Sequence, residues 1–128
     1  MFGIFNNPKR EARGLLGDAR VIIENVSHTY QEQRLREIAC QTRDDLAHVE
    51  MNCEANIGSL KRELDRHTSL HRDARRSQDP VALTAHTLVI INIRASILGE
   101  PGQAVIELIG EFVQTWCEGE PQVAVLAG

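Results

Sequence analysis

Three ionisable side chains spaced four residues apart form the pattern in this sequence that is best suited to chemistry. Glu63, His67 and His71 follow one another at intervals of four, which places them on one face of a helix. Two imidazoles with a neighbouring carboxylate are a donor set that binds Zn, and also Fe or Ni. The spacing therefore indicates a metal site on this helix face.

A fourth candidate ligand, His86, lies beyond a turn predicted at residues 77–80. A short turn makes consecutive helices antiparallel neighbours, so a fold-back there brings His86 level with His67 and His71. We predict a divalent metal site at Glu63, His67, His71 and His86. The competing interpretation is a cluster of semi-polar side chains with no cofactor, because the many arginines nearby would repel a cation.

A basic segment over residues 61–76 surrounds these histidines and could meet phosphate or an acidic partner. Glu63, Asp65 and Asp73 dilute its charge, and no aromatic side chain interleaves it for base stacking. The net charge of the chain is −4, which argues against a general nucleic-acid binder. We interpret the segment as a solvated helix end whose positive charges complement the helix dipole.

The cysteines Cys40, Cys53 and Cys117 are odd in number and have no CxxC spacing. This pattern is typical of reduced thiols in the cytoplasm, and isolated cysteines usually serve as small buried hydrophobes. The sequence contains no glycine-rich phosphate loop, no GxSxG and no Cys–His spacing typical of an activated nucleophile. We therefore expect a cytoplasmic protein that is not an enzyme.

The elements that position these residues are predicted to be helices throughout. Aromatic residues make up only 4% of the chain and are absent between Tyr30 and Phe112, whereas strand-rich domains usually carry more of them. The length of 128 residues corresponds to one domain. The sequence therefore predicts a single all-α domain over 1–128, a helical bundle packed with aliphatic side chains.

Capping signals divide this bundle into four predicted helices. Asparagine before Pro8 and Asp79 before Pro80 each combine an N-cap residue with proline at the first helical position. Glycine and proline at 99–102 and 119–121 mark turns. The predicted helices cover about 8–25, 29–76, 80–98 and 102–118, with a loose apolar tail at 119–128.

The longest predicted helix, 29–76, carries a coiled-coil-like seam in which apolar residues from Leu35 to Ala74 follow 4,3 spacing. The seam is thin and partly polar, so such a helix needs neighbouring helices. Whether it is continuous with the first helix stays open. Residues 25–30 are poor helix formers, and Thr29 with Glu32 matches a capping box.

The helix predicted at 80–98 is apolar on most of its surface, which indicates a central position in the bundle. His86, Asn92 and Arg94 lie within it and argue against a membrane span, so we expect a soluble protein. The predicted core includes Leu88, Ile91, Ile109 and Phe112.

The apolar helix faces exceed what one chain can cover. We therefore expect a dimer or tetramer of this chain with an apolar interface. The sequence favours a non-enzymatic helical interaction protein. It would act as a homo-oligomer that scaffolds, chaperones or regulates another protein, and the sequence does not identify that partner. The alternative is a metal-binding helical protein that uses the histidine cluster.

Overall fold

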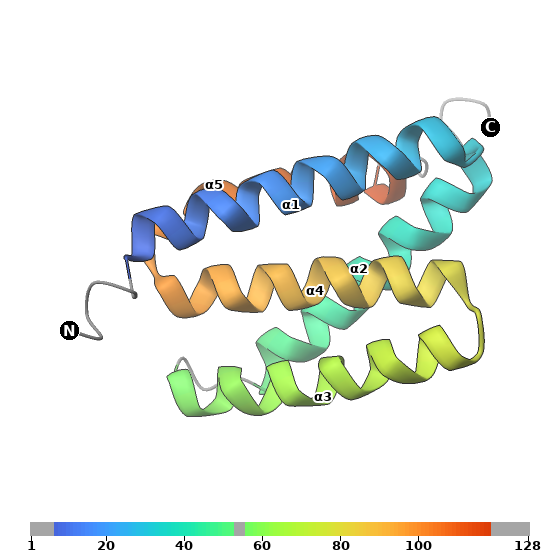
Figure 1. Cartoon of the computed structure of the whole chain (residues 1–128). Coiled ribbons are helices and arrows are strands. Elements are labelled where there is room, and N and C mark those ends of the chain that lie inside the picture. The colour runs from blue at the N-terminus through green and yellow to red at the C-terminus, as the bar shows by residue number, and fades with distance from the viewer. Residues whose placement is uncertain (1–6, 53–55, 119–128) are drawn as a thin grey trace.

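The computed structural model describes residues 7–52 and 56–118, and this part of the chain is an all-α bundle without strands (Figure 1). Its helices are α1 (Pro8–Thr29), α2 (Glu32–Asn52), α3 (Ile57–Arg76), α4 (Pro80–Leu98) and α5 (Gln103–Val113). A 3₁₀ turn, η2 (Glu100–Gly102), precedes α5, and a π-helical segment, η3 (Gln114–Glu118), follows it. The predicted all-α class is confirmed here, while Cys53 and the predicted tail at 119–128 lie outside the described residues.

Helix α4 is the central element, with the bounds that the sequence predicted. It packs against α1, α2, α3 and α5, and Figure 1 shows it between α1 and α3 with α2 crossing behind. Its buried residues include Leu88, Val89 and Ile93. By length and composition alone α4 would also pass for a membrane span, with a mean hydropathy of 1.7. Only 39% of that apolar window is buried inside the bundle, so part of α4 stays uncovered.

The predicted continuous helix over 29–76 is wrong. Helix α2 ends at Asn52 and α3 begins at Ile57, and the chain reverses direction between them (Figure 1). Asn56 has extended backbone angles (φ −130°, ψ 154°) and caps α3, its Oδ1 accepting the Ser59 N–H at 2.8 Å. Folding back allows both halves of the seam to pack on α4 of the same chain, which one continuous helix could not do.

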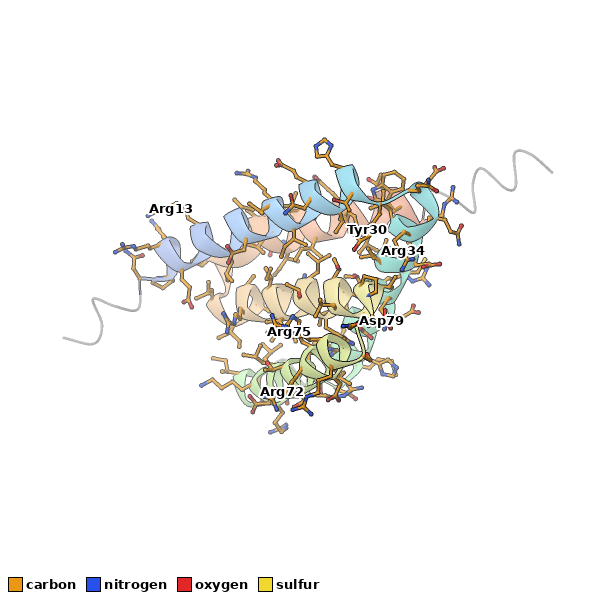
Figure 2. The ribbon with its side chains drawn as sticks, turned by 45° about the vertical axis from the view of Figure 1, so that its right-hand side comes forward. Arg13, Tyr30, Arg34, Arg72, Arg75 and Asp79 are labelled. Carbon is orange, nitrogen blue, oxygen red and sulfur yellow. The ribbon has the colours of Figure 1, made fainter. Side chains whose placement is uncertain are left out.

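The boundary between the first two helices exists, but it lies later than predicted. Helix α1 continues to Thr29 rather than ending near residue 25, and Tyr30 is extended (φ −106°, ψ 151°). Val26 is buried in the core, so packing keeps the last turn helical despite its poor helix formers. Figure 2 shows Tyr30 and Arg34 next to each other at this corner, with the guanidinium carbon 5.8 Å from the ring centroid, a cation–π distance.

The turn from α4 to α5 depends on two glycines. Gly99 has a φ of 76°, a region that favours glycine. At Gly102 the backbones approach so closely that a Cβ would overlap the carbonyl group of Ala95. The helix predicted at 102–118 is regular only from Gln103 to Val113 and then widens into η3.

The core lies mainly between α1, α2, α4 and α5. The four predicted core residues are confirmed as buried: Leu88 and Ile109 are fully buried, and Ile91 and Phe112 are 6% and 4% exposed. A second, smaller cluster of Val49, Val89 and Ile93 lies between α2 and α4, with Leu60 and Leu64 of α3 packed against it.

Candidate metal site between α2, α3 and α4

The buried face of α3 is mostly polar. Its four buried residues are Ser59, Glu63, His67 and Ala74, and its leucines are only partly buried. A helix usually attaches to its neighbours through an apolar stripe, and buried polar groups need partners of their own. The contacts of α3 with its neighbours therefore depend in part on polar interactions.

One of these polar side chains, His67, converges with a polar side chain from each of two other helices. The potential ligand atoms of Asp45 on α2, His67 on α3 and His86 on α4 all lie within 4.8 Å of one another. The His86 Nδ1 is 3.2 Å from Asp45 Oδ2 and 3.4 Å from His67 Nδ1. The antiparallel turn at residues 77–79 and the crossing of α2 behind α4 bring them together (Figure 1).

Two of the three separations between these atoms match those of ligands around one ion. Four tetrahedral ligands at about 2.0–2.1 Å from a Zn²⁺ ion stand about 3.3–3.4 Å from one another. The two distances at His86 Nδ1, 3.2 and 3.4 Å, fall close to this separation. Two imidazole nitrogens and one carboxylate oxygen are also a donor set that suits Zn, Fe and Ni.

Protons alone satisfy this cluster poorly. The Nδ1 of His86 offers one proton or one lone pair, yet it faces both Asp45 Oδ2 and His67 Nδ1. In addition, the Nε2 of His67 is buried and has no hydrogen-bond partner among the described residues. An unpartnered buried polar group costs about 1–3 kcal/mol, a cost that an apolar side chain at position 67 would avoid. The nitrogen of His67 that adjoins His86 is Nδ1, and an ion held there would leave Nε2 without a partner. Support for a binding role therefore comes from the unmatched contact between the two Nδ1 atoms and Asp45 Oδ2.

The electrostatic surroundings favour the protonation states that bind metals. Burial lowers the pKa of His67 from its ordinary value, with only partial opposition from the charge of Asp45. Burial by itself would raise the pKa of Asp45, but hydrogen bonds from His86 and Gln41 outweigh it and lower that pKa. A neutral imidazole with a free lone pair and an ionised carboxylate are the forms that coordinate a divalent ion.

The structure brings together two of the four ligands that the sequence predicted. His67 and His86 adjoin, as the fold-back argument required. Glu63 is buried on the same face of α3, but its Oε1 pairs with Arg66 Nη1 at 3.3 Å and it is outside the cluster. His71, one turn further along α3, is half-buried and lines a groove with Thr87 of α4 instead.

Asp45 is the candidate ligand that sequence reasoning missed. On one continuous helix Asp45 and His67 would stand 22 positions apart, or about 33 Å at about 1.5 Å per residue. The incorrect prediction of helix 29–76 therefore excluded Asp45 from the site. The break at Asn56 was the signal that could have revealed it.

The arginines that argued against a cation are exposed. They are Arg62, Arg66, Arg72, Arg75 and Arg76. Exposed charges are screened by water and salt, so these side chains oppose an ion in the buried cluster far less than their number in the sequence indicated. The geometry of the site itself then decides what it can hold.

No protein-family model matches this chain, and comparisons with curated proteins and with solved structures find no significant similarity.

Proposed function

We propose that this chain is a metal-binding helical protein in which Asp45, His67 and His86 hold one divalent transition-metal ion. Zn²⁺ is the first choice, with Fe²⁺ and Ni²⁺ as alternatives of the same ligand preference. The observation that carries the proposal is the convergence of three ligand atoms from three helices within 4.8 Å.

A structural role for the ion follows from where its ligands lie. His67 and His86 are only 1% and 7% exposed, so a substrate would have little access to the ion. Each ligand comes from a different helix, and an ion would join α2 and α4 to α3, whose own buried face is mostly polar. Metal binding of this kind contributes directly to folding free energy. We therefore propose binding and stabilisation rather than catalysis.

Calorimetric titration of metal-stripped protein tests this proposal. We expect wild type to bind one equivalent of Zn²⁺, and Asp45→Asn, His67→Ala and His86→Ala each to lose that binding. Glu63→Gln and His71→Ala are matched controls, because the structure places both residues outside the cluster. Binding that survives Asp45→Asn but disappears in His71→Ala would contradict the proposed site and support the ligand set predicted from sequence.

A second candidate function is self-association as a helical interaction protein, and the groove over the uncovered part of α4 favours it. Asp18 and Val21 of α1 and Ile90 and Arg94 of α4 are among its lining residues, and Val21 is 57% exposed. Opposite charges beside an apolar centre suit a two-fold contact in which Asp18 of one copy meets Arg94 of the other. The occupant we propose is a second copy of this chain.

Light scattering at micromolar concentration tests this second function. We expect a dimer for wild type and a monomer for Val21→Glu. The matched control is Met51→Glu, because Met51 is 80% exposed on α2 and does not line the groove; this variant should stay dimeric. A compact wild-type monomer would contradict self-association and leave the metal proposal unaffected. A scaffolding, chaperone or regulatory role toward another protein would then need a different surface.

A further inference from the structure

Two cysteines that are far apart in the sequence meet at the C-terminal end of the described chain. Cys40 on α2 and Cys117 in η3 are 77 positions apart, and their sulfur atoms are 2.6 Å from each other. The sulfurs of a disulfide bond lie about 2.05 Å apart, so a small movement separates these two thiols from a covalent bond. Both are free thiols in this structure.

The π-helical segment η3 places Cys117 at this position. Helix α5 is regular up to Val113, after which the wider turn of η3 packs on α2 and buries Cys117 to 4% exposure. Segments of π-helix are rare in proteins, and those that occur are frequently located at functional sites. Cys40 is partly buried and Cys117 is buried, so Cys40 is the more exposed residue of the pair.

A guanidinium group completes the cluster. The Arg43 Nη1 is 2.8 Å from the sulfur of Cys117, and Asp44 holds the same guanidinium through its Oδ1 at 3.1 Å. The pKa of Cys117 is raised to about 11, mainly by burial and next by the neighbouring Cys40, while the positive charge of Arg43 acts to lower it. Cys117 therefore keeps its proton near neutral pH, and Arg43 is placed to stabilise negative charge on that sulfur when the proton leaves.

We propose that Cys40 and Cys117 are a reversible oxidation site at which a hydroperoxide forms an intramolecular disulfide. The sulfur of Cys40, the less buried residue, attacks one peroxide oxygen and breaks the O–O bond, which yields a sulfenic acid at Cys40; the thiol proton passes to the other oxygen, which leaves as water or alcohol. The Cys117 sulfur then attacks the Cys40 sulfur, its proton leaving with the hydroxyl group as water. One peroxide is reduced and two thiols are oxidised, and a dithiol reductant reverses the change.

Oxidation would link η3 to α2 through the disulfide bond between Cys117 and Cys40. The closed loop spans most of the chain, and a cross-link over a long loop stabilises a protein mainly by restricting its unfolded state. We expect the melting temperature of the oxidised protein to exceed that of the reduced protein by on the order of 10 °C. This site is separate from the proposed metal site, since it shares no residue with Asp45, His67 and His86.

The test is peptide mapping by mass spectrometry after treatment of metal-free protein with one equivalent of hydrogen peroxide. We expect a peptide pair joined through Cys40 and Cys117, a fall from three free thiols to one, and full recovery with dithiothreitol. Cys53→Ser is the matched control, because it removes the third cysteine and should leave the cross-link intact. Cys40→Ser should form no intramolecular cross-link through Cys117.

A second variant tests the role of the guanidinium. Arg43→Met should slow formation of the disulfide several-fold without lowering its final yield, because a positioning residue affects the rate of the second step and not the identity of the bond. Three free thiols after peroxide treatment, or a disulfide that involves Cys53 or a second molecule, would overturn the proposal. Retention of one equivalent of Zn²⁺ by Cys40→Ser would show that the two sites act independently.

Discussion

Replacing His67 by leucine should have opposite effects on stability with and without metal. In the absence of metal, the imidazole is buried at 1% exposure, its Nε2 has no partner among the described residues, and its Nδ1 makes one long contact of 3.4 Å. Leucine has a similar size and no polar atom. Removing an unsatisfied buried group recovers about 1–3 kcal/mol, so His67→Leu should be more stable than wild type in chelator by about 1–2 kcal/mol.

Zinc should reverse this order. A ligand at about one hundred times its dissociation constant stabilises the folded state by about 2.7 kcal/mol. Wild type gains this free energy, whereas His67→Leu lacks one of three ligands and gains almost none of it. The variant should then be less stable than wild type by about 1 kcal/mol, the difference between the two effects. His71→Leu is the matched control on the next turn of α3 and should respond to zinc as wild type does.

Urea unfolding followed by far-ultraviolet circular dichroism, in chelator and in zinc, measures both differences. For an all-α chain the helical signal reports the whole fold. Lower stability of His67→Leu in chelator by about 2 kcal/mol or more would contradict this prediction, because it would show that the imidazole is fully satisfied by protein groups. An equal gain in zinc for wild type and His67→Leu would place the ion elsewhere.

Three further predictions concern the core, the turn and the thiols. Ile91→Asp should abolish soluble expression, because an unpaired charge would lie at a 6% exposed position of α4; near-native yield and melting would contradict this. Gly102→Ala should lower the free energy of unfolding by about 1–3 kcal/mol, because its Cβ would overlap Ala95. In the control Gly110→Ala the Cβ meets open space, so the free energy of unfolding should rise by up to about 1 kcal/mol. Equal urea midpoints for the two variants would contradict this difference. Because burial raises the pKa of Cys117 to about 11, its alkylation by iodoacetamide should be slow near neutral pH and accelerate as its thiolate forms at high pH. Peptide mapping measures this rate, and fast labelling near neutral pH would disagree.

Capping and helix-breaking residues explain which parts of the fold could be predicted from sequence. Asp79 before Pro80 and Gly99 after Leu98 define α4 through capping chemistry within a few residues, and its all-round apolar surface indicates its central place. The break between α2 and α3 has no proline, and its decisive residue is one capping asparagine, Asn56. Absence of helix breakers permits a long helix but does not require one, and burial on α4 favours two shorter helices.

The candidate site was predictable to the same extent as the helices that carry it. The pairing of His67 with His86 depends only on helical spacing and one short turn, both of which are readable in the sequence. The contribution of Asp45 depends on how α2 crosses α4, which is a matter of packing between distant segments. The meeting of Cys40 and Cys117 has the same origin, since it requires α2, α5 and the π-helical turn of η3 to be placed together.

The most direct test of the proposed metal site is the metal content of untagged protein, measured by inductively coupled plasma mass spectrometry for three matched samples. We expect about one equivalent of a divalent transition metal in wild type and in Glu63→Gln, and loss of that metal in Asp45→Asn. The aspartate variant is the sharpest of the set, because it keeps the size of the side chain and both histidines while removing only the carboxylate charge. Metal-free wild type that also binds no added Zn²⁺, or equal metal content in Asp45→Asn and wild type, would contradict the proposed metal site.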